Sequence, residues 1–161
     1  MDKELEKEVP FLREAIQVSI KNVQENNGGP FGAVIVKDGK IIARGANRVT
    51  TKNDPTAHAE VEAIRQACAL LGTFDLSGCD IYASCEPCPM CLGAIYWSRV
   101  DHLYFAATKE DAAEIGFDDA FIYEEIGKSF QSRSLFTRHF LRDEALAAFK
   151  LWNESSAKKP Y

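Results

Sequence analysis

The chain has 161 residues, 46% of them hydrophobic, and a formal net charge of −5. This length and apolar content predict one domain, residues 1–161, with a sizeable core. The acidic balance disfavours a protein that neutralises many phosphates, so a nucleic-acid partner is not expected, although a local basic patch is compatible with an acidic molecule.

The sequence also limits the cellular compartment. No apolar run approaches the roughly 18 residues of a membrane span, and residues 1–8 are charged where a secretory signal would be apolar. The cysteine count is odd, and Cys68 and Cys79 lie in apolar contexts that indicate packing, which favours a reducing compartment. We therefore expect a cytoplasmic protein without membrane contact.

The N-terminal third predicts a helix followed by a hairpin. Residues 9–24 carry apolar side chains at roughly helical spacing and end in an Asn- and Gly-rich stretch, 26–29, that is typical of a helix end. The segments 31–36 and 40–44 are apolar and β-branched, and the Lys-Asp-Gly sequence at 37–39 between them has hairpin chemistry. We expect two antiparallel strands here.

Strands and helices then alternate along the chain. Asp54 and Pro55 have the pattern of an N-cap and a first helical residue, and an apolar stripe continues from there to Leu71. The remaining elements are expected as strands at 79–84 and 101–106 and as helices from Pro89, at 109–116 and at 145–152. Two antiparallel strands followed by strand–helix units indicate a mixed sheet flanked by helices.

Three residues with metal-binding side chains stand at two of the predicted helix starts. Cys88 and Cys91 are three apart, so with Pro89 as the first helical residue both sulfurs share one face at a helix N-terminus, where the partial positive charge favours thiolates. His58 lies at the other helix start. One imidazole and two thiolates, with a fourth position left for water, form a catalytic zinc site. The sequence therefore predicts one Zn²⁺ bound by His58, Cys88 and Cys91.

Glu60 adds a reactive group to this metal site. In an ideal helix Glu60 and His58 would lie about 200° apart, so both can approach one ion only where the first turn is irregular. Zinc lowers the pKa of a bound water to about 7, and a neighbouring carboxylate can take the proton of that water and return it to a substrate nitrogen. The pattern predicts hydrolytic deamination, with Glu60 as the catalytic residue.

A closed metal site is the structural alternative. Cys85 could supply a fourth sulfur, which would leave no open position and would make the site inert. That arrangement needs three sulfurs from one tight segment and gives Glu60 no role.

The two motifs resemble those of a known superfamily. Residues 58–60 read His-Ala-Glu and residues 87–91 read Pro-Cys-Pro-Met-Cys. They are similar to the H-A-E and P-C-x-x-C motifs of the cytidine deaminase-like superfamily. This resemblance implies an α/β fold with three layers, α/β/α, around a central mixed sheet of about five strands.

Within the superfamily, nearly the whole chain resembles the small bacterial guanine deaminases. The segments that carry the resemblance are 28–37, 53–60, 87–97 and 116–119, together with the terminal tyrosine. The resemblance implies a free purine base as substrate, with guanine giving xanthine and ammonia. It also implies a homodimer that exchanges C-terminal segments, in which the helix and tail of residues 143–161 close the active site.

The same resemblance implies roles for individual residues. Asn47 and Asp119 would hold or protonate the base, Phe31 and Trp97 would line its pocket beside Ala59, and Tyr161 would close the site of the partner subunit. Each role has a structural alternative: Asn47 could satisfy a turn, the two aromatic residues could belong to the core, Asp119 could cap a helix, and a terminal tyrosine could be frayed.

Other functions fit the same zinc motifs. A tRNA adenosine deaminase would need a basic surface for the anticodon stem, and residues 133–142 do interleave arginines with phenylalanines. A cytosine or other pyrimidine deaminase would differ only in its pocket. A zinc-stabilised interaction module without activity is the third alternative. The sequence leaves the base specificity and the strand order open.

Overall fold

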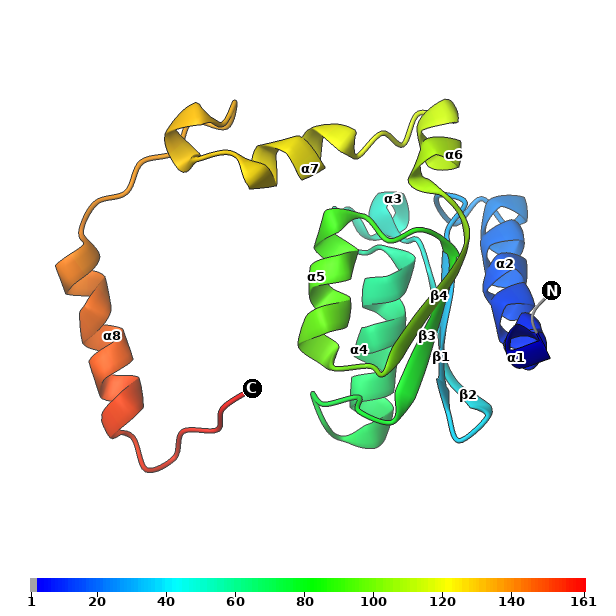
Figure 1. Ribbon diagram of the computed structural model, residues 1–161, viewed down its shortest axis with the longest axis horizontal. Coiled ribbons are helices and arrows are strands. Elements are labelled where there is room, and N and C mark those ends of the chain that lie inside the picture. The colour runs from blue at the N-terminus through cyan, green and yellow to red at the C-terminus, as the bar shows by residue number, and fades with distance from the viewer. Residues whose placement is uncertain (1–2) are drawn as a thin grey trace. The chain divides into compact units, whose positions relative to one another are not determined.

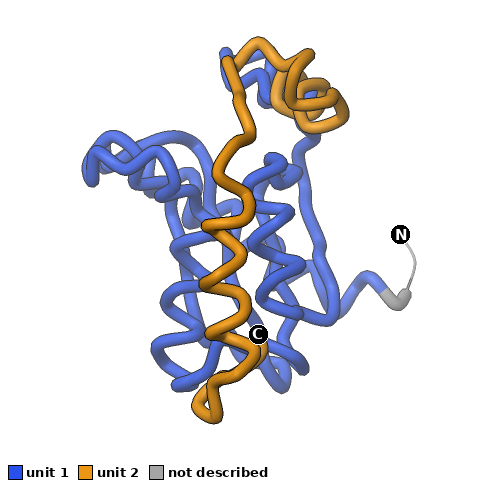
Figure 2. The backbone as a smooth tube through the Cα atoms, turned by 90° about the vertical axis from the view of Figure 1, so that its left-hand side faces the viewer, with its two compact units in different colours: residues 1–119 blue, residues 120–161 orange. Residues whose placement is uncertain are grey.

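The computed structural model describes residues 3–161. The chain forms two compact units, which divide after Asp119 (Figure 2). In the first unit a four-stranded mixed sheet lies between helices, with α4 and α5 on one face and α2 on the other (Figure 1). This is the three-layer α/β/α architecture that we expected, although with four strands in the described residues where about five were predicted. The difference arises because the chain after β4 continues as helices.

The elements of the first unit follow the predicted order. Their bounds are α1 Lys3–Glu6, α2 Val9–Gln24, β1 Gly32–Lys37, β2 Lys40–Ala46, α3 Val49–Lys52, α4 Ala59–Leu71, β3 Cys79–Cys85, α5 Pro89–Ser98, β4 His102–Ala107 and α6 Lys109–Glu114. The two short helices α1 and α3 were not predicted from the sequence.

The β1–β2 hairpin forms because its turn residues accept left-handed backbone angles. Asp38 and Gly39 have φ of 50° and 69°, which is the pattern of the tight turns that match strand twist. The sheet order is β2-β1-β3-β4, with β1 antiparallel to β2 and β3, and β3 parallel to β4. The strands β2, β3 and β4 therefore run in one direction, and their C-terminal ends lie at the same edge of the sheet.

Both faces of the sheet are covered, which explains the nearly continuous apolar run of β1. Ala33 and Ile35 pack in the core cluster on the α4 side, whereas Val34 and Val36 pack with Tyr82 in the cluster that contains residues of α2. Successive strand side chains point to opposite faces, so a strand buried on both sides has no polar positions to alternate with.

The second unit is built from helices. It comprises α7 Ala120–Gly127, a 3₁₀ turn at Phe130–Ser132 and α8 Arg142–Glu154. Glu125 is buried and accepts hydrogen bonds from the Lys128 ammonium at 2.7 Å and from the Ser134 backbone N–H at 2.7 Å. No residue of α8 is buried. None of the helices in residues 3–161 combines the length and apolar character that crossing a bilayer requires.

Candidate active site

Two helix starts meet at the candidate metal site. His58 is the N-cap residue of α4 and Cys88 is the N-cap residue of α5, and both have extended backbone angles (φ −74°, ψ 158° and φ −64°, ψ 167°). Pro89 is the first residue of α5, where its fixed φ suits the helix and its missing N–H is not needed. Cys91 follows in the same first turn and is fully buried.

The three donor atoms have the separations that a tetrahedral zinc ion needs. The ligand atoms of His58, Cys88 and Cys91 all lie within 4.8 Å of one another. The Nδ1 atom of His58 is 3.5 Å from the Sγ of Cys88 and 3.5 Å from the Sγ of Cys91. Zn–N and Zn–S bonds of about 2.0 and about 2.3 Å at a tetrahedral angle place nitrogen and sulfur about 3.5 Å apart. The residues present therefore fit zinc.

The electrostatics of the cluster also favour a cation. The pKa of Cys88 is lowered to about 4, chiefly by a hydrogen bond from Cys91 and to a smaller extent by one from His58. The same hydrogen bond to Cys88 raises the pKa of Cys91, and the Cys88 thiolate raises the pKa of His58. One sulfur thus carries a negative charge at neutral pH, which is the state that binds zinc.

Glu60 lies beside this cluster. It is the second residue of α4, it is 7% exposed, and its carboxylate is hydrogen-bonded with the thiol of Cys91. Burial raises the pKa of Glu60, because a carboxylate loses its hydration away from water. A carboxyl group with a raised pKa next to a metal site is suited to taking and returning a proton.

Cys85 does not take part in the cluster. Its thiol donates to the backbone carbonyl of Thr108 at 3.4 Å, and burial raises its pKa to about 11. Among the described residues, the group of side chains that could hold a metal ion here consists of His58, Cys88 and Cys91 and does not include Cys85. The geometry thus contradicts the closed four-ligand alternative.

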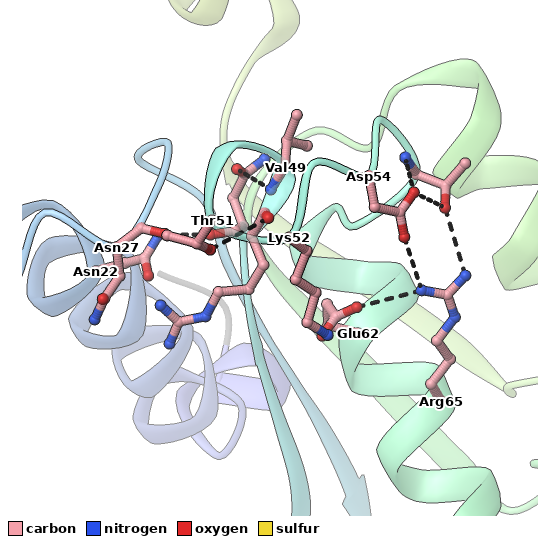
Figure 3. A network of polar contacts seen from close by, with 11 residues as sticks. Asn22, Asn27, Val49, Thr51, Lys52, Asp54, Glu62 and Arg65 are labelled. Carbon is pink, nitrogen blue, oxygen red and sulfur yellow. Dashed lines mark hydrogen bonds and ion pairs between the residues drawn. The ribbon is translucent and has the colours of Figure 1, made fainter.

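A polar network holds the loop that delivers His58 (Figure 3). Arg65 lies in the second turn of α4. Its guanidinium is 3.7 Å from the carboxylate of Asp54, 3.4 Å from the hydroxyl of Thr56 and 3.3 Å from the carboxylate of Glu62. Glu62 is buried and also accepts a 2.6 Å hydrogen bond from Lys52 at the end of α3. These contacts tie α3, the loop and α4 together just before the metal site.

The predicted cap at Asp54 is wrong. The helix begins at Ala59 and not at Pro55, because the Asp54 carboxylate accepts from the N–H and the hydroxyl of Thr56, at 2.8 and 2.7 Å, and so forms a turn. The correction does not move the zinc site, since His58 and Glu60 still stand at the irregular start of the helix.

Three of the residues assigned to the substrate lie in the first unit near the edge of the sheet that carries the metal site. Asn47 is buried directly after β2, and Phe31 is half-buried directly before β1. Asp119 is half-buried, and burial together with the negative charge of Cys88 raises its pKa. The structure therefore places the Asp119 carboxyl within electrostatic reach of the metal cluster.

The other assigned residues have different surroundings. Ala59 is buried as the first residue of α4. Trp97 is 65% exposed near the end of α5, and Tyr161 is 71% exposed in the second unit. The roles of these residues stay predictions.

Sequence reasoning missed two residues of this region. Phe117 packs edge-on against Phe31, with ring centroids 5.0 Å apart and planes at 89°, and so anchors the segment that carries Asp119. Asn22 is buried on α2 and is hydrogen-bonded to the backbone of Asn47. An asparagine within the apolar stripe of an amphipathic helix was the available signal for Asn22.

Comparison with known proteins supplies the context for this geometry. Residues 5–107 match the family described as cytidine and deoxycytidylate deaminase zinc-binding region. Guanine deaminase of Bacillus subtilis is 54% identical over 151 residues, 94% of this chain and 97% of the relative. A tRNA-specific adenosine deaminase of Agrobacterium fabrum is 46% identical over 101 residues, 62% of this chain and 66% of the relative.

Solved structures give the same pattern. The X-ray structure of the Bacillus subtilis guanine deaminase superposes with a TM-score of 0.93 at 52% identity, over 100% of this chain and 99% of that chain. A guanine deaminase of Nitrosomonas europaea superposes with a TM-score of 0.65 at 38% identity, over 68% of this chain and 63% of that chain.

Proposed function

The chain belongs to the family of zinc-dependent cytidine and deoxycytidylate deaminases, and from this premise we propose that it deaminates a free purine base, converting guanine to xanthine and ammonia in purine catabolism. The observation that carries the proposal is the cluster of one imidazole and two thiols with the Glu60 carboxyl beside it. This arrangement can supply both a metal and a proton carrier for hydrolytic deamination.

The choice of guanine rests on the last third of the chain. The family match ends at residue 107, whereas the likeness to guanine deaminase covers 94% of the chain. The tRNA-specific relative matches only 62% of the chain. Residues beyond the shared catalytic region therefore support a guanine deaminase over a tRNA-editing enzyme.

His58, Cys88 and Cys91 would hold one zinc ion per subunit, leaving a fourth position for a catalytic water. Zinc, when bound, lowers the pKa of that water to about 7 and so makes a nucleophile available at neutral pH. Glu60 accepts the proton of the water and delivers it to the ring nitrogen next to the carbon that bears the amino group. Once the water oxygen is bonded to that carbon, Glu60 would take the second proton of the water from it, and this proton passes to the amine from Glu60 or by way of Asp119, so that the C–N bond breaks and ammonia leaves.

Asn47 would orient the base. Its Oδ1 accepts from the backbone N–H groups of Gly29 and Val49, at 3.2 and 3.3 Å. With the oxygen held in this way, the amide nitrogen is the group left to donate to an acceptor on the purine ring. The turn that Asn47 satisfies and its proposed contact with substrate use different atoms, so the two interpretations are compatible.

The second unit supports the proposal of a homodimer with exchanged C-terminal segments. Its helices expose large apolar side chains, among them Phe121, Ile126, Phe149, Leu151 and Trp152, each at least 47% exposed. A stable monomer rarely leaves so many apolar side chains in water. A second copy of the chain would cover them, and Tyr161 would then reach the active site of the partner.

The five free cysteines of the described residues accord with a cytoplasmic location, because thiols persist in a reducing compartment. Two of these thiols, those of Cys88 and Cys91, belong to the candidate metal cluster, where their oxidation would remove a ligand.

Ammonia release tests the function. The zinc-loaded protein is assayed with guanine, adenine, cytosine, their nucleosides and tRNA, and we expect product from guanine. Glu60→Gln should keep the zinc content and lose turnover by about 10²–10⁴-fold, as expected for loss of an acid–base residue. Activity on tRNA or cytosine without activity on guanine would overturn the assignment, and undiminished turnover by the Gln variant would remove Glu60 from the mechanism.

A further inference from the structure

A buried amide on α2 holds the loop that carries Asn47. Asn22 is 2% exposed, and its Nδ2 donates to the backbone carbonyls of Gly29 and Asn47, both at 2.9 Å. Both hydrogens of the amide are thus used by two backbone positions that are 18 residues apart in sequence. Figure 3 shows Asn22 within the polar contacts that join the end of α2 to α3.

Asn47 is bound reciprocally to the same loop. Its Oδ1 accepts from Gly29 and Val49, and its backbone N–H donates to Phe31 at 3.1 Å. Asn22 therefore holds the main chain of Asn47 while Gly29 and Val49 hold its side-chain oxygen. With these atoms fixed, the direction of the Asn47 amide nitrogen is determined by the loop.

The backbone at Gly28 packs closely against the backbone of Asn47. At Gly28 a Cβ would lie 2.2 Å from the carbonyl oxygen of Asn47, the same oxygen that accepts from Asn22. Because glycine has no side chain, the backbone at position 28 can lie this close to the Asn47 carbonyl, and the same carbonyl stays within hydrogen-bond distance of Asn22.

Asn22 also carries a cost that its two hydrogen bonds must offset. Its Oδ1 is buried and has no hydrogen-bond partner in the described residues. A buried acceptor without a partner costs about 1–3 kcal/mol, and an apolar side chain at this position of α2 would avoid that cost. The contribution of Asn22 therefore lies in the two bonds that its Nδ2 makes.

We propose that Asn22 is a positioning residue for purine binding, which fixes the Asn47 loop so that the Asn47 amide meets the base. The proposal rests on the function assigned above to Asn47. Because Asn22 acts only through Asn47, its removal should weaken the binding of substrate and transition state alike, and so raise KM while kcat is kept.

The test compares two substitutions on the same helix face. Asn22→Leu keeps the approximate shape and removes both donors. Ser19→Ala is the matched control, since Ser19 is also buried but its hydroxyl bonds to Ile16 in its own helix. We expect Asn22→Leu to raise the KM for guanine about 10-fold or more relative to the control, as for a lost buried hydrogen bond, with kcat within about 2-fold.

A double-mutant cycle with Asn47→Ala separates positioning from general destabilisation. In the Asn47→Ala background, Asn22→Leu should no longer change KM. An equal effect in both backgrounds, or a KM like that of Ser19→Ala, would overturn the proposal. Asn22→Ser, which can donate one hydrogen bond, replaces the leucine variant if that variant does not fold. Its KM should lie between the KM of Ser19→Ala and the KM expected for Asn22→Leu.

Amide hydrogen exchange provides a readout that does not depend on the reaction. The N–H groups of Gly29 and Val49 should exchange faster in Asn22→Leu than in Ser19→Ala, because their acceptor on Asn47 is loosened. If the wild-type protein does not deaminate guanine, the proposed function fails by itself. Unchanged exchange at these two amides would refute the positioning role in either case.

Discussion

The contact between Gly45 and α4 allows a test of how closely α4, the helix that carries Glu60, packs on the sheet. A Cβ built on Gly45 of β2 would lie 2.0 Å from the carbonyl oxygen of Ala59 and 2.5 Å from the backbone nitrogen of Ala63. Both are main-chain atoms of α4, so no side chain can rotate to make room. Gly45→Ala should therefore force the helix away from the sheet.

The magnitude follows from the required displacement. To restore an ordinary contact of 3.4 Å from 2.0 Å, α4 must retreat by about 1.4 Å. Overpacking of a core usually costs about 1–3 kcal/mol, and rigid backbone on both sides places this case at or above the upper end. At about 2–4 °C per kcal/mol for a chain of this size, Tm should fall by about 6–12 °C or more.

Gly93→Ala is the matched control for this substitution. Gly93 lies inside α5, and a Cβ there would meet nothing within 4 Å. It should raise the stability by about 0.5–1 kcal/mol, because alanine is the better helix former. Thermal unfolding of the zinc-loaded variants, together with zinc affinity by chelator competition, measures both. A Tm for Gly45→Ala within about 2 °C of the wild type would refute the close seating of α4.

Two further substitutions probe the network before α4 and the helices of the second unit. Arg65→Met should weaken zinc binding several-fold in chelator competition, with Tm lowered by no more than about 1–4 °C because the side chain is 56% exposed; Arg13→Met, on the exposed face of α2, is the control. Glu125 has a pKa lowered to about 2, chiefly by Lys128. Its stabilising contribution is therefore complete above its unfolded pKa of 4.5 and is lost as the pH falls toward 2, so Glu125→Gln should flatten the pH dependence of unfolding in that window.

The sequence predicted the metal cluster well because short-range rules determine it. Pro89 as the first helical residue fixed the geometry of Cys88 and Cys91, and the structure begins α5 at that residue. The start of α4 was predicted four residues too early, since Asp54 and Pro55 satisfy the rules for a cap while the carboxylate is used in a turn with Thr56. Local patterns do not distinguish these two uses of an aspartate.

The contacts that the sequence did not reveal connect elements far apart in the chain. Asn22 contacts Asn47, 25 residues further along the chain, and Phe117 contacts Phe31 at a still larger separation in sequence. Both contacts depend on the strand order β2-β1-β3-β4, which no local pattern determines. With that order known, the C-terminal ends of β2, β3 and β4 deliver Asn47, Cys88 and the Asp119 segment to a single edge, the usual place for a ligand site in an open α/β sheet.

Tyr161 lies in the second unit, and a complementation experiment tests its proposed contribution to the site. Deletion of residues 159–161 should lower kcat/KM for guanine by about 10-fold or more without changing Tm, because residues 159–161 are exposed. If the tail serves the partner subunit, a mixed dimer of the truncated chain and Glu60→Gln regains activity. The truncated subunit then keeps its own Glu60 and receives Tyr161 from the other chain. The truncated homodimer should keep about a tenth of the activity or less and the Glu60→Gln homodimer should be nearly inactive; mixtures whose turnover does not rise above the sum of the two would show that each tail closes its own site or none.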